Sequence, residues 1–328
     1  MSIDVTKLQA TRDGFGQAMI ELGNENPQVV ALCADLRDSL RLADFSKNFP
    51  DRYIECGVAE QNMMSVGAGL ALGGKIPFIA SFAVFNPGRN LDQLRVATYS
   101  QLNIKIVGGY AGFGNGGDGA THQAFEDLAI MSALPGMTVL APADAEQAKI
   151  LTKLAAKHIG PTYLRLGRLD LPTLSDITEK EQSIKIGKAQ LLREGSDLSI
   201  FTTGAMAFAA LSASAKLNQL GLSVEIINFH TLKPFDCQAA IKSAQKTQAV
   251  LVAAEHDQRS GLASIVSQTL AESMGDPLVS PIAFASLGID NRFGESGKNQ
   301  DLLDKFELNE FGIIKQIKLL LTKKKNLI

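Results

Sequence analysis

Short apolar runs alternate with amphipathic stretches along the first half of the chain. One helical pattern covers 11–24, and a second, rich in small residues, follows Gly57. Strand-like runs lie between such patterns, at 29–33, 53–56, 76–80, 104–107 and 137–140. This alternation predicts a mostly parallel sheet that is covered by helices on both faces.

The polarity of the chain changes after this first pattern. Residues 173–196 are polar, charged and rich in turn formers, which indicates a crossing segment. A second α/β pattern follows, with strands expected at 198–202, 223–227 and 247–253 and helices at 205–220 and 262–273. We therefore expect an α/β domain at 1–175, a crossing segment at 176–195 and a smaller α/β domain at 196–328.

Composition narrows the class of protein. The 328 residues are 45% hydrophobic and 20% charged, and a net charge of -2 gives no basic field for nucleic acid or an anionic membrane. The apolar stretches are all shorter than the ~18 residues that a membrane span needs. The three cysteines are widely spaced and charges come early in the chain, so we expect reduced thiols, no secretory signal and a cytoplasmic protein.

The most unusual local composition is the glycine-rich stretch 108–119, which follows a predicted strand. Gly112, Gly114 and Gly117 satisfy the G-x-G-x-x-G spacing of dinucleotide-binding proteins. That motif needs an acidic residue about 20 positions later, at the end of the next strand, to hold a ribose. The nearest acid there is Asp144, inside an Ala-Pro-Ala-Asp turn, and the loop comes late in the domain. A Rossmann-type site is therefore disfavoured.

The same stretch leads into Asp118 and His122, a carboxylate and an imidazole four residues apart. We expect both at the carboxyl end of a strand, where open α/β sheets bind ligands. An imidazole delivered there by a glycine-rich loop suits proton transfer. The residues equally allow a structural interpretation, in which Asp118 caps the turn and His122 begins the helix.

Glu60 occupies the first turn of the helix predicted after Gly57. A carboxylate there gains ~0.3–1 kcal/mol from the helix dipole, which is a sufficient structural reason for its presence. Alternatively, the carboxyl group lies at the carboxyl edge of the sheet beneath Met63, Phe82 and Phe85. Burial would then favour the protonated form, which donates a hydrogen bond. The spacing alone does not choose between the two.

Several motifs occur together and in order along the chain. The first half holds Arg12, Asp35-x-x-x-Ser39, Gly57-Val-Ala-Glu60-Gln-Asn-Met63, Ser81-Phe82-x-x-Phe85, Gly117-Asp-Gly-x-Thr-His122-Gln123 and Arg165-Leu-Gly-Arg168. The second half adds Thr202-Thr-Gly204, Thr231-Leu-Lys-Pro234, Glu255-His256 and Phe293-Gly-Glu-Ser296-Gly297. Each motif is weak by itself, but the ordered set resembles the pyrimidine-binding and C-terminal domains of transketolases over nearly the whole chain.

This resemblance implies the thiamine-diphosphate-binding fold, with a mostly parallel pyrimidine-binding domain and a smaller α/β C-terminal domain. It also implies that Glu60 hydrogen-bonds the aminopyrimidine of thiamine diphosphate. Phe85, with Phe82 nearby, would form an aromatic wall against that ring, and Asp35 would lie close to the thiazolium. The cofactor would supply the electron sink for moving a two-carbon ketol unit from a ketose phosphate to an aldose.

The same resemblance implies a set of substrate-binding residues. His122 would contact the donor hydroxyl and move protons, and Asp118 would hold the acceptor hydroxyl. Arg12, Ser39 and Arg168 match positions that grip a sugar phosphate, for which the guanidinium geometry is suited. Taken singly, each arginine is more typical of a solvated or salt-bridged surface charge.

Two positions depart from the resemblance. Tyr110 stands where transketolases usually carry a histidine, twelve residues before His122, and Gly88 stands where a tyrosine often follows the phenylalanine pair. These differences leave the donor and acceptor sugars open. A specialised sugar phosphate, or a non-sugar acceptor, is compatible with the residues present.

The metal and diphosphate ligands of transketolases are not recognisable in this chain. In the family a Gly-Asp-Gly motif and a following Asn hold Mg²⁺ and the diphosphate, whereas the next Asn after Gly117-Asp118-Gly119 is the distant Asn218. The chain therefore resembles the C-terminal subunit of a split transketolase, which needs a separate N-terminal subunit carrying the Mg²⁺ ligands, in an α2β2 assembly. Alternatives are the β subunit of a 2-oxo-acid dehydrogenase, a deoxyxylulose-phosphate-synthase-like subunit and a non-catalytic binding or assembly protein.

Overall fold

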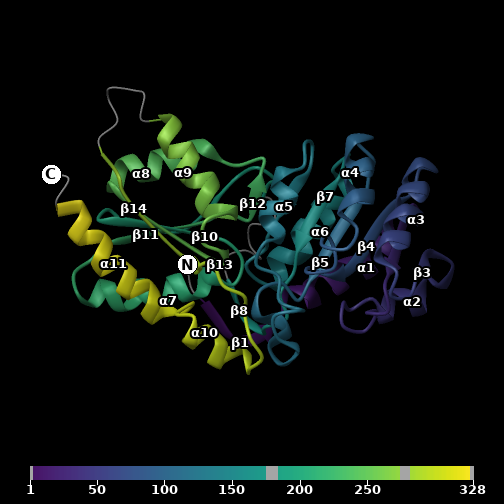
Figure 1. The fold of residues 1–328 in the computed structure, drawn as a ribbon, viewed down its shortest axis with the longest axis horizontal. Coiled ribbons are helices and arrows are strands. Elements are labelled where there is room, and N and C mark those ends of the chain that lie inside the picture. Colours follow the sequence, from purple (N-terminus) through teal and green to yellow (C-terminus); the bar gives the residue numbers. More distant parts are fainter. Residues whose placement is uncertain (1–2, 175–183, 274–280, 326–328) are drawn as a thin grey trace.

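The chain folds into two α/β halves that lie side by side (Figure 1). The computed structural model describes residues 3–174, 184–273 and 281–325. Within these residues the strands form sheets of seven, five and two strands. The expected class, a mostly parallel sheet followed by a smaller α/β part, is confirmed. In the part of the chain that is described, none of the helices has the length and apolar character needed to cross a bilayer.

The larger sheet has the strand order β12-β6-β7-β5-β4-β2-β3. Its strands are β2 (Val29–Cys33), β3 (Tyr53–Glu55), β4 (Ile76–Phe82), β5 (Lys105–Gly109), β6 (Thr138–Leu140), β7 (Thr162–Arg165) and β12 (Thr231–Lys233). All neighbours pair in parallel except β12, which is antiparallel to β6. β7 was not predicted from the sequence because two of its four residues are polar and the run is too short to stand out.

Helices cover both faces of this sheet, as the alternating pattern predicted. They are α1 (Thr11–Glu25), α2 (Ala43–Asn48), α3 (Glu60–Leu72), α4 (Leu91–Tyr99), α5 (Asp127–Ala133) and α6 (Ala145–Lys157). Alternate residues of β2 enter different apolar clusters. Ala31 packs in one cluster with Phe15 of α1, whereas Leu32 packs in the other with Met63 of α3. A strand buried on both faces explains why its sequence is uniformly apolar.

Asp144, the acid weighed above for a ribose site, has a structural role. Its Oδ1 accepts the backbone N–H of Gln147 at 2.8 Å and thereby caps the N-terminus of α6. Its Oδ2 accepts the backbone N–H of Leu174 at 2.8 Å. Both carboxylate oxygens are engaged within the fold, which is a further argument against a dinucleotide site at this position.

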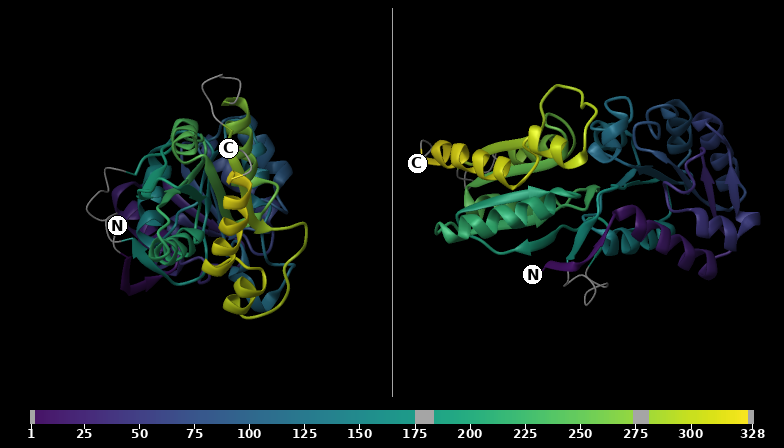
Figure 2. Two further views of the ribbon diagram at one scale, coloured as in Figure 1. Left: turned by 90° about the vertical axis from the view of Figure 1, so that its left-hand side faces the viewer. Right: turned by 90° about the horizontal axis from the view of Figure 1, so that it is seen from below.

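The smaller sheet has the order β14-β13-β10-β11-β9 and is parallel except for β9. Its strands are β9 (Gln190–Arg193), β10 (Leu198–Thr202), β11 (Val224–Asn228), β13 (Ala249–Asp257) and β14 (Ala283–Ile289). The helices are α7 (Met206–Gln219), α8 (Cys237–Thr247), α9 (Gly261–Ser273), α10 (Asn299–Lys305) and α11 (Glu310–Lys325). α7 packs with α11 and α8 packs with α9, in two layers on the sheet (Figure 2). β9 falls within the segment 176–195 expected as a crossing, of which residues 176–183 lie outside the described residues.

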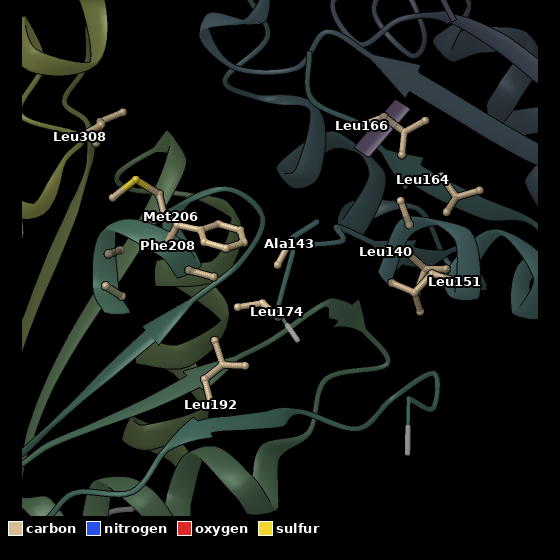
Figure 3. Close-up of a cluster of buried hydrophobic side chains, with 14 of the residues drawn as sticks. Leu140, Ala143, Leu151, Leu164, Leu166, Leu174, Leu192, Met206, Phe208 and Leu308 are labelled. Atoms are coloured by element: carbon tan, nitrogen blue, oxygen red, sulfur yellow. The ribbon is translucent and has the colours of Figure 1, made fainter. Parts of the chain in front are cut away.

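The two halves share a core. β12 comes from the second half of the chain but extends the sheet of the first half. The short antiparallel pair β1 (Ile3–Gln9) and β8 (Leu171–Leu174) lies beside this junction (Figure 1). One apolar cluster continues from the first half into the second; among its members Figure 3 labels Leu140, Ala143, Leu164, Leu174, Leu192, Met206 and Phe208. Burying this surface fixes the orientation of the two halves.

Candidate active site

The carboxyl ends of five parallel strands meet at one edge of the larger sheet. The segments that leave β2, β3, β4, β5 and β7 there carry Asp35, Glu60, Phe85, Tyr110 and Arg168. Open α/β sheets bind their ligands at this edge. The parallel topology therefore gathers residues that are up to 133 positions apart in the sequence, between Asp35 and Arg168.

Glu60 is the first residue of α3 and is only 4% exposed. Its Oε1 accepts a hydrogen bond from Nη1 of Arg89 at 2.7 Å, and the arginine side chain is 45% exposed. Glu60 is buried at the carboxyl edge, but here its carboxyl group accepts a hydrogen bond from a guanidinium, so its functional interpretation stays a prediction. Its partner Arg89 was not predicted. The single available signal was that Arg89 follows Phe85 by four residues in the same loop.

Phe85 is the centre of a row of ring contacts. The guanidinium carbon of Arg89 lies 3.8 Å from the centroid of the Phe85 ring. The Phe82 ring is roughly parallel to it with centroids 6.1 Å apart, and the His122 ring meets it edge-on at 5.2 Å. Three of the predicted residues, Phe82, Phe85 and His122, are thus brought together, and Arg89 links them to Glu60.

Tyr110 connects this aromatic row to the predicted arginines. Its ring centroid lies 4.4 Å from that of Phe82. The guanidinium carbons of Arg12 and Arg168 lie 4.9 Å and 5.2 Å from the Tyr110 ring centroid. Nη1 of Arg12 donates hydrogen bonds to the Tyr110 hydroxyl and to the backbone carbonyl of Ser39, the latter at 2.9 Å. Arg12, Ser39 and Arg168 therefore meet around Tyr110, one of the two positions at which the sequence departs from the family resemblance.

Positive charge is concentrated at this end of the row. Burial lowers the pKa of Arg12, and the neighbouring Arg41 and Arg168 act in the same direction, whereas Tyr110 and Asp13 oppose them. Nε of Arg12 is buried and has no hydrogen-bond partner. Arg41 is paired with Asp13, with 2.5 Å between Nε and Oδ1. A cluster of guanidinium groups with an unused donor is suited to an oxyanion.

Asp35 and Asp118 lie at the margins of this arrangement. Asp35 is exposed, has a left-handed backbone with φ 57°, and donates its N–H to Glu55 Oε1 at 2.7 Å. It lines a surface pocket together with Ser39 and Tyr53. Asp118 is exposed at the end of a short 3-10 turn. Within the described residues, no hydrogen bond or ion pair joins Asp118 to the other predicted site residues, so its role stays a prediction.

The glycine-rich loop that presents His122 is held by the second half of the chain. Glu255 of β13 accepts the backbone N–H of Phe113 at 2.8 Å. Gly112 has φ +66°, and a Cβ there would overlap the Glu255 carboxyl group, so both backbone conformation and space require glycine. Further along the loop, the backbone carbonyl of Gly116 accepts the N–H of Gly297 at 2.9 Å. The sequence had marked Glu255 as part of a motif without a role.

A buried polar cluster lies behind this loop. Arg165 Nε is 3.0 Å from Asp127 Oδ2, and Arg165 Nη2 donates to the backbone carbonyl of Glu255 at 2.8 Å. The Tyr163 hydroxyl donates to the same Asp127 carboxylate at 2.8 Å. Burial raises the pKa of Glu255 and lowers the pKa of His256 to about 4. The cluster joins the two halves through satisfied charges rather than through apolar contact alone.

The fold and this arrangement define a two-part α/β protein with a candidate ligand site at the carboxyl edge of its larger sheet. Residues 7–173 match the family model "Transketolase, pyrimidine binding domain", and residues 187–313 match "Transketolase, C-terminal domain". The chain therefore belongs to the transketolase family. The expected thiamine-diphosphate-binding fold with a smaller transketolase C-terminal domain is confirmed.

Two relatives of similar length are named as transketolase subunits. The 6-deoxy-6-sulfo-D-fructose transketolase subunit SqwH of Clostridium sp. is 38% identical over 305 residues, which are 93% of this chain and 92% of that protein. A subunit of the apulose-4-phosphate transketolase of Phocaeicola vulgatus is 34% identical over 308 residues, covering 93% of this chain and 96% of that protein. A solved structure described as "Split gene transketolase, inactive beta4 tetramer" is 40% identical, with a TM-score of 0.87 and coverage of 96% and 99%.

The site residues fit the pyrimidine half of thiamine diphosphate, which the family uses. Arg89 presents a planar group that donates an N–H to Glu60 and lies on the Phe85 ring. The same carboxylate and the same ring would accept an aminopyrimidine, which is also planar and carries N–H donors. Among the residues that the structure describes, no group of three or more His, Cys, Asp or Glu side chains could hold a metal ion.

Proposed function

We propose that this chain is the C-terminal subunit of a split transketolase, which moves a two-carbon ketol unit from a ketose phosphate to an aldose acceptor with thiamine diphosphate. The observation that carries the proposal is the continuous row of contacts from the buried Glu60 carboxylate through Arg89, Phe85, Phe82 and Tyr110 to the guanidinium of Arg12, with His122 set edge-on against Phe85. One end suits a heteroaromatic cofactor, and the other suits an anionic substrate.

Each residue has a role in this proposal. The cofactor supplies a stabilised carbanion for breaking and forming carbon–carbon bonds. Glu60 hydrogen-bonds the aminopyrimidine ring nitrogen, and Phe85 orients that ring by stacking while Phe82 supports it. His122, which touches Phe85, holds the donor hydroxyl and carries its proton.

The remaining predicted residues bind the ends of the substrates. Arg12, Ser39 and Arg168 hold the terminal oxyanion, and Arg12 also donates a hydrogen bond to the Ser39 backbone carbonyl. Asp118 binds the acceptor hydroxyl from the exposed end of the glycine-rich loop. Asp35 lies towards the thiazolium, in the pocket that it shares with Ser39.

The working enzyme needs a second chain in this proposal. The partner is an N-terminal transketolase subunit that supplies the Mg²⁺ and diphosphate ligands, in an α2β2 assembly in the cytoplasm. Two observations support it: two relatives matched over more than nine-tenths of their length are named as transketolase subunits, and a similar solved structure is described as an inactive beta4 tetramer. Those transketolase names also favour this function over a 2-oxo-acid dehydrogenase or deoxyxylulose-phosphate-synthase-like subunit.

The test is two-carbon transfer from xylulose 5-phosphate to ribose 5-phosphate with thiamine diphosphate and Mg²⁺. Three samples are compared: the chain alone, the chain with its N-terminal partner, and Glu60→Ala with that partner. We expect transfer only in the unmodified pair. Activity of the chain alone would contradict the need for a partner, and full activity of Glu60→Ala would remove Glu60 from cofactor activation. Cofactor binding by the pair without transfer would direct the search to other sugars.

A further inference from the structure

Two buried asparagines lie in the segment that links β4 to α4. Asn86 and Asn90 are four residues apart, and both are fully buried. Nδ2 of Asn86 donates to the backbone carbonyl of Ile79 in β4 at 2.9 Å and to that of Val107 in β5 at 3.0 Å. Both hydrogens of this amide are thus bonded to neighbouring strands, so Asn86 is anchored to the larger sheet itself.

Asn90 extends this anchor to Glu60. Its Nδ2 donates to Oδ1 of Asn86 at 3.0 Å and, over a longer distance of 3.4 Å, to the backbone carbonyl of Glu60. The strand carbonyls that Asn86 faces can only accept hydrogen bonds, so the orientation of its amide is fixed, and its Oδ1 must accept from Asn90. A buried chain of amide hydrogen bonds therefore runs from the sheet to the first residue of α3.

The place of Asn90 in the fold indicates that its side chain has a task other than helix capping. Asn90 is the N-cap of α4, where an asparagine side chain ordinarily accepts a backbone N–H of the first helical turn. Here it makes no such bond, and among the described residues its buried Oδ1 has no hydrogen-bond partner. α3 also begins without a side-chain cap, at Ala59. The Asn90 amide therefore holds the start of α3 rather than capping its own helix.

Two consecutive residues thus contact Glu60 at its two ends. Arg89 pairs with the carboxylate at 2.7 Å, and Asn90 donates to the backbone carbonyl. The Arg89 side chain is 45% exposed and can leave when a ligand arrives, whereas the buried amide cannot leave without disrupting the segment. Asn86 directly follows Phe85, so the same link fixes the backbone of that aromatic residue.

We propose that Asn86 and Asn90 are positioning residues, which fix the Glu60 carboxyl group relative to the Phe85 ring. The inference rests on the proposed function, in which Glu60 and Phe85 hold the aminopyrimidine. It adds two residues that belong to none of the motifs behind the family resemblance. A displacement of about 1 Å in a reacting group can cost about 10²-fold in rate, so loosening the first turn of α3 lowers kcat.

The experiment compares Asn86→Ala and Asn90→Ala with the unmodified chain, each in the reconstituted pair with saturating thiamine diphosphate. We expect kcat for two-carbon transfer to fall about tenfold or more in each variant. KM for both sugars stays within about twofold, because the sugar-binding residues lie at the other end of the row. The double variant loses no more than the larger single loss, since the two amides act as one link. Additive losses, or a higher KM with unchanged kcat, would overturn the proposal.

Two further variants separate positioning from stability and from helix capping. Asn228→Ala removes an equally buried asparagine of β11, whose Nδ2 donates to Gln147 Oε1 at 3.1 Å. We expect a drop in Tm similar to that of Asn90→Ala, but no change in kcat. Asn90→Ser keeps a residue that caps helices well but is too short to reach both partners, so it should lose kcat as Asn90→Ala does. An equal loss of kcat in Asn228→Ala, or full kcat in Asn90→Ser, would mean that Asn90 acts through stability or capping.

A measurement without cofactor separates this inference from the proposed function. Amide hydrogen exchange in the chain alone is followed by mass spectrometry for peptides that cover the first turn of α3, which begins at Glu60. We expect exchange about tenfold faster in Asn90→Ala than in the unmodified chain or in Asn228→Ala. If the unmodified pair transfers no sugar but this difference remains, the link stands and the reaction is wrong. If the pair transfers sugar and Asn90→Ala alters neither exchange nor kcat, the reaction stands and the link is wrong.

Discussion

Glu60 and Tyr110 lie at opposite ends of one row of side chains, but different parts of the molecule hold them. Glu60 and Arg89 belong to segments that follow β3 and β4, and their contacts stay within the larger sheet and its helices. Tyr110 and His122 flank a glycine-rich loop whose backbone is bonded to Glu255 and Gly297 of the second half. The larger domain alone holds the Glu60 end of the row. The loop at the Tyr110 end is held by the smaller domain as well.

This difference indicates a task for the smaller domain. It contributes none of the predicted cofactor or substrate residues, all of which lie at or before Arg168. Its contacts instead fix the loop that carries the substrate residues. Changes at the Glu60 end should therefore act on the cofactor alone, whereas changes at the contact between the halves should act on substrate binding and on stability together.

The largest effect is expected at the cofactor end. Glu60→Gln keeps the size of the side chain and a hydrogen bond but cannot exchange a proton. We expect transfer by the pair to fall about 10²–10⁴-fold, which is the usual size of a lost acid–base contribution. Steady-state rates measure this. Glu194→Gln, a highly exposed carboxylate, is the control. A loss below tenfold for Glu60→Gln would contradict the role of this carboxyl group.

The next effect is expected where the second half holds the loop. Gly112→Ala adds a Cβ at φ +66° that overlaps the Glu255 carboxyl group. We expect a loss of about 2–5 kcal/mol in the free energy of unfolding, from the disfavoured backbone and the overpacking together, and a higher KM for the sugar. Gly117→Ala is the matched control in the same loop, since its Cβ would meet nothing within 4 Å. If Gly112→Ala and Gly117→Ala had the same free energy of unfolding in urea, the close approach of Glu255 to Gly112 would not constrain the loop.

A smaller effect is expected from pH. Burial lowers the pKa of His256 to about 4, below its ordinary value of 6.5. The unfolded chain therefore binds this proton more readily, so the free energy of unfolding falls as the pH drops from about 6.5 through 4, by up to about 3 kcal/mol for one such group.

Urea unfolding at several pH values checks this pH dependence. His256→Gln should flatten the curve over that range. His230 is a comparison within the same half, because burial lowers its pKa to about 4 as well. His230→Gln should flatten the curve equally but leave the glycine-rich loop, and hence the sugar KM, unaltered. If the free energy of unfolding of His256→Gln still fell with pH as steeply as that of the unmodified chain, His256 would not be the source of the pH dependence.

The smallest effect is expected at Arg89. Its side chain is 45% exposed, so solvent screens the ion pair with Glu60 and Arg89→Ala should cost only about 1 kcal/mol of stability. The same change uncovers the Phe85 ring and the Glu60 carboxylate, and we expect cofactor to bind at least as tightly. Thermal unfolding and calorimetric titration of the pair with thiamine diphosphate measure the two effects. Weaker cofactor binding would mean that Arg89 supports the pyrimidine site instead of covering it.

Much of the architecture could be predicted from apolar periodicity. The run 29–33 became β2 without change, because a strand buried on both faces must be apolar throughout. β7 and β9 were missed, since each is four residues long and carries polar side chains. In the structural interpretation His122 begins a helix, but α5 begins only at Asp127, because the residues before it belong to the loop that the second half holds.

The sequence by itself determined the α/β class, the family resemblance and the residue types of the site, because these depend on local patterns and ordered motifs. Only the tertiary structure decided which of them meet. Arg89 on Glu60, Tyr110 between two arginines, and Glu255 on the glycine-rich loop are contacts across 29, 98 and 142 positions. Such contacts arise from how strands are ordered in the sheet and how the halves pack, and no local spacing in the chain records either.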